Sequence, residues 1–390
     1  MYTLTLDEQT YTGADLRYLY YPGDDEFVVS DFTVNLSMEE CGTVEFTIYK
    51  DHPYYNAIIP RISMVTFRRD GKIMFNGQVH STKLNIDGSM NVYAVDELAF
   101  LLDSVQPQRY LTSTTYSQAI NLMLNYHNSV MPASKKFLPG LITSPGDETA
   151  LARCVITTNY EKTLNIIRDE MAFETYYEDG VIVEQKQTFM KVTRGTEDVT
   201  DMKHLNLYTF NRYNQMFAPE LNQTIRLGHN MQDYQHTESG EGLVTALIPL
   251  GAKLDTEVVP GLEARLDITS VNGGVNYITD NRAVQTYGLI FDVVEFDDVT
   301  KASNLKRLGE MTLQARSPIV STYEISAVDL SMVDADFDAF ELGAAVRVQE
   351  DINSNQSIHT DDLPFYGIIG MNINPLDPTS NSITLVRGIS

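Results

Sequence analysis

The stretch that most constrains the fold runs from residue 64 to 95, where apolar and polar residues alternate around two Asp-Gly turns. Alternation with a period of two is typical of strands that bury one face. Asp70-Gly71 and Asp87-Gly88 suit tight reversals, because residues in such turns must tolerate positive φ. The alternating apolar positions are Val65, Phe67, Ile73, Phe75, Val79, Met90, Val92 and Ala94. The stretch therefore predicts a β-meander.

The same pattern returns near the C-terminus, over residues 346–385. A strand-like segment precedes a polar excursion over 353–362, and two further apolar segments flank a loop at Asp377-Pro378. Both copies contain Phe-x-Gly, and the separation from its glycine to a later asparagine is the same: Gly77 to Asn91 and Gly367 to Asn381. We interpret the two copies as an internal duplication of one small β-domain. Chance similarity between two meanders is the alternative, since many strands share such patterns.

Composition limits the classes of function. The chain has 390 residues and 43% hydrophobic residues, which predicts a folded protein of two to four domains. Its formal net charge of −25 argues against a surface that grips nucleic acid, which needs clustered Lys and Arg. We expect neither a membrane span, because no apolar run is long enough, nor a secretory signal peptide, because residues 1–7 lack a basic region and an apolar core.

The two cysteines, Cys41 and Cys154, lie far apart and form no CxxC pair. We therefore expect buried thiols and neither a disulfide framework nor a structural zinc site.

The order of patterns predicts a mainly β, α+β chain with five regions. Helices are expected over 115–126, capped by Thr114 or Thr115, over 160–172, capped by Asn159, and over 300–315. Residues 228–242 are expected to form a polar loop and 243–251 an apolar strand. The predicted regions are a β-domain (1–105), an α+β domain (106–202), a second β-domain split into 203–252 and 316–390, and an α+β insertion (253–315).

No motif identifies an active site, since the sequence has no nucleophile elbow, P-loop, HExxH or dinucleotide fingerprint. His229 and His236 share the polar segment with Asp233 and Glu238, but their spacing fits a solvated loop better than a metal site.

Two acidic clusters are also interpreted as structural. Residues 334–338 resemble the start of a calcium loop, but Ala339 replaces the required glycine and Ala345 the final glutamate. Glu161 and Glu170 could be proposed as an acid and base, yet nothing fixes them across a substrate. We therefore assign no catalytic, cofactor-binding or metal-binding residue and expect no cofactor.

The chain resembles the tail-tip proteins of long-tailed phages of Gram-positive bacteria in the order of its regions and in its sequence segments at 222–228, 243–251, 287–290 and 296–300. This is the prophage endopeptidase tail, or tail-associated lysin, family, which is similar to the baseplate hub proteins of contractile phages. The resemblance implies two tail-tube-like β-barrel domains related by duplication, with two smaller α+β inserted domains.

The resemblance also implies a structural hub at the distal tip of a phage or prophage tail. A homotrimer would close the tube as a ring, because three chains with two barrels each can match a sixfold tube. The implied partners are the distal tail protein, tail-tube proteins, a receptor-binding protein and the tape measure protein. DNA would pass through the lumen without specific binding, since an acidic lumen repels phosphates. The expected location is the virion, after synthesis in the host cytoplasm.

Two other functions stay open: a cell-wall-degrading tail endopeptidase or lysin, and a carbohydrate-binding tail adhesin. In the family, the enzymatic part commonly resides in a C-terminal extension. Because this sequence ends at Ser390, soon after the second meander, we expect it to be no enzyme.

Overall fold

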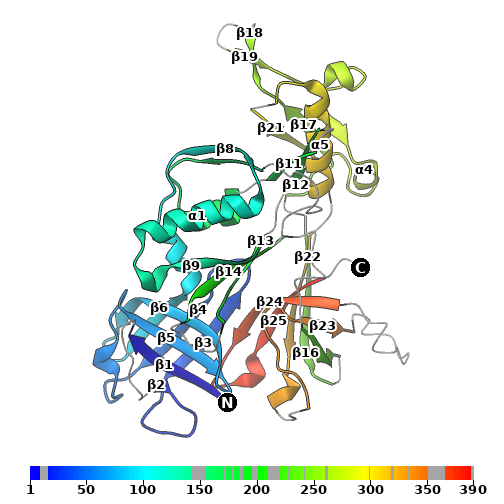
Figure 1. Ribbon diagram of the computed structural model, residues 1–390. Coiled ribbons are helices and arrows are strands. Elements are labelled where there is room, and N and C mark those ends of the chain that lie inside the picture. Colours follow the sequence, from blue (N-terminus) through cyan, green and yellow to red (C-terminus); the bar gives the residue numbers. More distant parts are fainter. Residues whose placement is uncertain are drawn as a thin grey trace.

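The computed structural model confirms a mainly β, α+β protein (Figure 1). It describes residues 1–8, 16–142, 154–170, 173–177, 180–184, 188–195, 201–209, 219–226, 229–240, 242–259, 262–297, 299–317, 320–332, 334, 336–349 and 365–387. The polar excursion expected over 353–362 lies outside these residues.

One 13-stranded sheet dominates the molecule. Its strand path runs β16-β22-β25-β24-β3-β4-β7-β6-β5-β1-β2, and β23 and β15 continue from β24 off this path. The N-terminal strands are β1 (Tyr2–Glu8), β2 (Arg17–Tyr20), β3 (Ser30–Ser37), β4 (Thr43–Ile48), β5 (Ser63–Arg69), β6 (Lys72–Leu84) and β7 (Met90–Asp96). The C-terminal strands are β15 (Glu220–Ile225), β16 (Met231–Ser239), β22 (Val320–Ala327), β23 (Ala345–Val348), β24 (Phe365–Ile373) and β25 (Ser382–Arg387).

The predicted duplication is visible in the strand order. The first β unit pairs its strands in the order β5-β6-β7-β4-β3, and the second in the order β23-β24-β25-β22-β16. A short 3-10 turn separates the same strands in each, η1 (Tyr55–Ala57) before β5 and η7 (Leu330–Met332) before β23. Both meanders also contain a bulge in the middle ladder, between Val79 and Ser81 and between Ile368 and Gly370. The units differ next to the meander, where β1 pairs antiparallel with β5 and β15 pairs parallel with β23.

When the strands of the two β units are aligned by their ladders, the two Phe-x-Gly motifs are offset by one residue. Val79 and Ile368 both enter the main core immediately before the bulge, which matches Gly77 with Tyr366 rather than with Gly367. Accordingly Phe75 is buried, whereas Phe365 is 38% exposed. A shift by one residue exchanges the two faces of a strand, so the sequence match was right about the meander and wrong about the equivalent residues.

The turn between β5 and β6 explains why the first meander could be recognised from the sequence. Arg69 pairs with Lys72 across a two-residue turn, in which Asp70 and Gly71 have φ of 50° and 84°. Positive φ at both central residues is the type I′ geometry that matches the right-handed twist of the flanking strands.

The two β units are joined edge to edge rather than separated by a linker. Residues Val34–Ser37 of β3 pair antiparallel with Gly370–Ile373 of β24. A single core runs beneath both units, with Phe32, Phe46 and Phe67 from the first and Tyr366, Ile368 and Leu385 from the second almost fully buried. The two units therefore form one curled sheet around one core.

An α+β unit covers one side of the first β unit (Figure 1). Its elements are β8 (Arg109–Thr114), α1 (Tyr116–Val130), β9 (Phe137–Ile142), β10 (Cys154–Thr158), α2 (Thr163–Asn165), β11 (Phe173–Tyr177), β12 (Gly180–Glu184), β13 (Thr188–Thr193) and β14 (Lys203–Thr209). Thr115 caps α1 in a capping box with Gln118, as the sequence predicted.

Two predictions for this unit need correction. The helix expected over 160–172 begins later, after Lys162 rather than Asn159, and continues as a π-helical turn over Ile166–Glu170. Strand β14 pairs with β13 and β9, so it belongs here and not to the second β unit as the range 203–252 implied.

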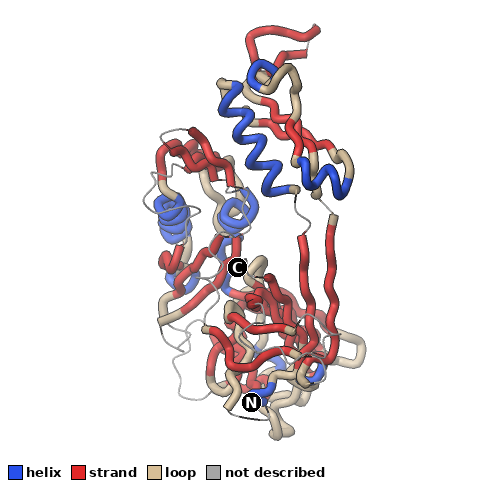
Figure 2. The backbone as a smooth tube through the Cα atoms, turned by 90° about the vertical axis from the view of Figure 1, so that its right-hand side faces the viewer, coloured by secondary structure: helices blue, strands red, loops and turns tan. Residues whose placement is uncertain are grey.

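A smaller inserted unit lies at the ends of the long strands β16 and β22 (Figure 2), and its helix α5 (Ala302–Arg316) contacts β12 of the α+β unit. It contains β17 (Ala246–Leu250), β18 (Lys253–Val259), β19 (Leu262–Arg265), β20 (Ile278–Thr279), α4 (Asn281–Tyr287), β21 (Phe291–Glu295) and α5 (Ala302–Arg316). Because β17 pairs with β20 and β21 over this unit's own core, it was wrongly placed in the second β unit. Residues 228–242 were wrongly predicted as a loop, since Met231–Ser239 form β16.

Candidate assembly surfaces

The joint between the β units combines backbone pairing, a small apolar core and buried polar contacts. On its backbone side, the Met38 amide donates to the Ile369 carbonyl at 2.9 Å, which extends the β3–β24 ladder. Behind this ladder, Phe189 of β13 packs with Met38 and Ile369 in a small separate core. The joint is therefore held by both units and by the α+β unit.

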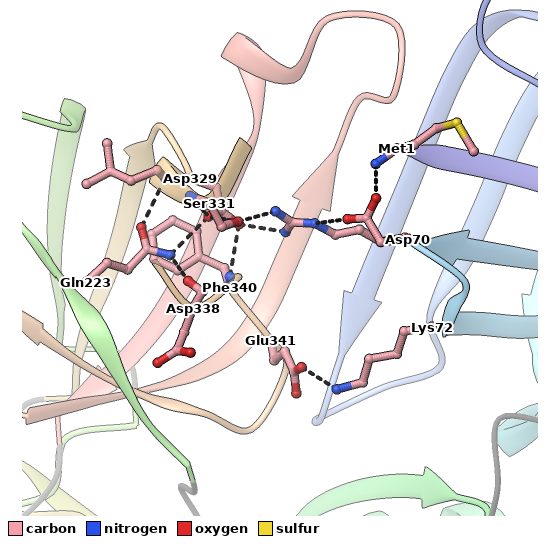
Figure 3. Close-up of polar contacts among 11 residues, drawn as sticks. Met1, Asp70, Lys72, Gln223, Asp329, Ser331, Asp338, Phe340 and Glu341 are labelled. Atoms are coloured by element: carbon pink, nitrogen blue, oxygen red, sulfur yellow. Dashed lines mark hydrogen bonds and ion pairs between the residues drawn. The ribbon is translucent and has the colours of Figure 1, made fainter. Parts of the chain in front are cut away.

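A buried ion pair spans the joint (Figure 3). Arg69, at the end of β5, donates from Nη1 to Asp329 Oδ2 at 2.6 Å, and both side chains are less than 10% exposed. Arg69 Nη2 also donates to Ser331 Oγ at 2.5 Å.

The Asp329 carboxylate is saturated with donors from the second β unit. Oδ1 accepts from Gln223 Nε2 at 3.0 Å and from the amide and hydroxyl of Ser331 at 3.1 and 2.7 Å. Oδ2 accepts from the Phe340 amide at 2.9 Å. Buried charges of this kind require a partner and satisfied hydrogen bonds, and both are present.

The electrostatics favour the charged form of the pair. Burial by itself would raise the pKa of Asp329, but the hydrogen bond and positive charge of Arg69 outweigh it and lower that pKa. The same partner acts on Arg69, whose pKa is raised despite burial. The joint is therefore an ion pair at neutral pH.

Two more exposed contacts flank the buried pair. The N-terminal ammonium of Met1 binds Asp70, and Lys72 binds Glu341 across the two units (Figure 3). The Lys72 side chain is 52% exposed, so this pair adds little stability on its own. It serves as a natural comparison for the buried pair.

A cavity of about 540 Å³ lies beside the joint, between the two β units and β13. Lys191 lines it and donates from Nζ to the Leu342 carbonyl at 2.7 Å, and burial lowers the pKa of this amine. Its other charged lining residues include Arg69, Lys72 and Glu341, which already pair across the joint. These contacts are structural and do not form a nucleophile with a base.

Among the described strands, the sheet also has edges that pair with no neighbouring strand. Strand β5 pairs with β6 only as far as Gln78. Among the described strands, residues 81–84 of β6 therefore pair with β7 alone. Leu84 on this extension is 68% exposed. Strand β16 forms one end of the path of described strands. Such edges are ready templates for pairing with another chain.

The acidic and histidine residues weighed in the sequence are not gathered into one site. His229, His236, Asp233 and Glu238 lie in or just before β16. No group of three or more His, Cys, Asp and Glu residues that could hold a metal occurs in the part of the chain that the structure describes.

The other acidic residues have structural partners. Asp338 Oδ2 accepts a hydrogen bond from the backbone N–H of Asn222 at 3.0 Å, and Asp334 Oδ1 accepts one from the backbone N–H of Asp336 at 3.0 Å. Glu161 accepts from the Lys162 amide and Asn165 Nδ2 at 2.9 and 2.8 Å, near the start of α2. The side chain of Glu170 lies outside the described residues.

Sequence reasoning missed the pairing of Arg69 with Asp329, because 260 residues separate them. Arg69 ends β5 and Asp329 lies two residues after β22, but a charged residue at the end of a strand does not by itself indicate its partner.

Comparisons with known proteins place these features in context. Residues 219–386 match the family model described as prophage endopeptidase tail. No curated protein matches the chain in sequence. None of the described helices has the length and apolar character of a membrane span.

Three solved structures of tail proteins share the fold over nearly the whole chain. A tail protein from Neisseria meningitidis MC58 has 12% identity and a TM-score of 0.57, with 99% of this chain and 96% of that one covered. The 43 kDa tail protein of prophage MuSo2 from Shewanella oneidensis has 13% identity and a TM-score of 0.54, covering 99% and 98%. Prophage tail protein gp18 from Listeria monocytogenes EGD-e has 12% identity and a TM-score of 0.52, covering 99% and 94%. The resemblance inferred from the sequence is confirmed at the level of family match and fold.

Proposed function

We propose that this protein, whose residues 219–386 match the family model described as prophage endopeptidase tail, is a structural hub at the distal tip of a phage or prophage tail. Three copies form a ring that closes the tail tube. The observation that carries the proposal is the repeated strand order within one chain, because three chains with two equivalent β units each supply six similar positions around an axis.

The rigid joint supports this assignment. A ring that mimics sixfold symmetry needs the two units of a chain to keep a fixed angle. The β3–β24 ladder, the shared core and the Arg69–Asp329 pair all oppose hinge motion between them.

The ring encloses the channel through which DNA leaves the particle. The net charge of −25 supports a channel that repels phosphates and lets DNA slide. Distal tail, tail-tube, receptor-binding and tape measure proteins are the proposed partners, and the virion is the proposed location.

The mass of the purified protein across a concentration series tests the ring. The proposal predicts a monomer–trimer equilibrium, or a stable trimer, with no dimer accumulating. A monomer at the highest soluble concentration, or a closed dimer, contradicts it. Binding of a DNA duplex to the assembled protein at moderate salt contradicts the repulsive channel.

A further inference from the structure

The internal joint provides a template for a joint between two copies of the chain. Each strand in the internal joint has an equivalent in the other β unit: β24 corresponds to β6, and β3 corresponds to β16. The equivalents do not pair with each other in this chain. They lie at separate parts of the sheet, with β16 at the end of the path and β6 well inside it.

Core-facing residues fix the correspondence of β24 with β6. Val79 corresponds to Ile368, since both precede the bulge and contact the same core. Residues 370–373 of β24, which pair with β3, therefore correspond to residues 81–84 of β6. This is the extension that pairs with β7 alone among the described strands.

The ladders fix the correspondence of β3 with β16 in the same way. Phe46 of β4 and Ile325 of β22 both enter the main core, opposite Val92 and Ile383 respectively. Counting from these partners matches Val34 with His236. Residues 34–37 of β3 then correspond to residues 236–239 of β16.

We propose that residues 81–84 of β6 in one copy pair antiparallel with residues 236–239 of β16 in the next. Copying the internal register places Ser81 opposite Ser239, Thr82 opposite Glu238, Lys83 opposite Thr237 and Leu84 opposite His236. The contact is heterologous, head to tail, and such contacts produce rings or open filaments according to their rotation. Its closure at three copies rests on the proposed function.

Physical chemistry favours a second copy as the occupant of this edge. In the internal joint, β24 pairs with β3. Because β6 is equivalent to β24 and β16 is equivalent to β3, the same pairing is expected between β6 of one copy and β16 of another. On the β6 extension, Ser81, Lys83 and Leu84 are exposed, as a strand edge awaiting a partner requires.

Cysteine pairing tests the register. The Met38–Ile369 hydrogen bond sets the alternation of the internal ladder and makes Asn35–Asn372 a non-hydrogen-bonded pair. Cα atoms of such pairs are about 4.5 Å apart, within the range that a disulfide bridges. The corresponding pair between copies is Lys83 with Thr237.

In a background with Cys41 and Cys154 replaced by alanine, Lys83→Cys/Thr237→Cys should convert the monomer band into covalent dimers and trimers under mild oxidation. An equimolar mixture of the two single variants should stop at dimers. Asn35→Cys/Asn372→Cys, the matched internal pair, should cross-link within one chain and leave the mass unchanged. Thr82→Cys/Thr237→Cys, one residue out of register, should cross-link little, because these side chains face opposite sides of the sheet.

Self-linking of Lys83→Cys alone, or equal linking by the out-of-register pair, overturns the proposal. A trimeric ring without the Lys83–Thr237 link also overturns it, while leaving the proposed function intact. Specific linkage into open chains that never close at three supports the strand pairing and contradicts the ring. Hydrogen exchange of the wild-type protein is the independent check: protection of residues 81–84 and 236–239 should rise with association, and unchanged exchange at both refutes the pairing.

Discussion

Replacing Asp329 with alanine should strongly destabilise the joint between the β units. The change removes a carboxylate that accepts five hydrogen bonds and leaves the Arg69 guanidinium buried without its partner. Breaking a buried ion pair by removing one partner costs about 3–5 kcal/mol. We expect a loss of this size in the free energy of unfolding.

The flanking pair supplies the matched control. Glu341→Ala removes an ion pair across the same two units, but one that is more exposed to water, and should cost less than about 1 kcal/mol. Urea unfolding followed by circular dichroism compares the variants, since the chain has no tryptophan. Hydrogen exchange in β3 and β24 shows whether the loss falls at the joint.

The pH dependence provides a second signature. Because the pKa of Asp329 is lowered in the folded protein, its contribution is present above its unfolded pKa and is lost as pH falls through the lower folded value. The difference in stability between wild type and Asp329→Ala should therefore be constant near pH 7 and shrink below about pH 4. Equal destabilisation by Asp329→Ala and Glu341→Ala, or a difference that grows on acidification, would refute the reasoning.

Three smaller perturbations test local parts of the account. Gly71→Ala, at φ 84° with no steric neighbour, should cost about 1 kcal/mol in urea unfolding from backbone strain alone, whereas Gly240→Ala should be neutral; equal effects would contradict this. Thr115→Ala removes the capping box of α1 and should cost about 1 kcal/mol, measured the same way, and no loss would show that the cap is dispensable. Burial raises the pKa of Asp96 to about 7, so the stability gained from its protonation should decline as pH rises from about 4 to 7; Asp96→Asn should remove that decline, and an unchanged pH profile would contradict it.

Local sequence signals predicted the features that depend on neighbouring residues. The Asp70-Gly71 turn and the Thr115 cap were identified because their chemistry is set within a few residues. The meander was identified because one face of each strand must be apolar. Its duplication followed from the return of that pattern.

Features that depend on distant pairing were missed or misplaced. Strand β16 carries polar residues along most of its length, so it has no alternation and is defined only by pairing with β22. Strands β14 and β17 were correctly predicted as strands but were assigned to the wrong unit, because the unit of a strand depends on the strands with which it pairs. The one-residue error in aligning Phe75 with Phe365 arose because a motif match carries no information about which face is buried.

The central claim is that two copies of one β unit, fixed side by side in a chain, allow three chains to imitate a sixfold ring. Rotational analysis of electron-microscope images of the assembled protein, viewed end on, tests it most directly. The account predicts a ring with a central opening, strict threefold symmetry and a strong sixfold component from the inner β units. A solid particle, or a ring whose inner wall shows threefold symmetry without the sixfold component, would contradict it.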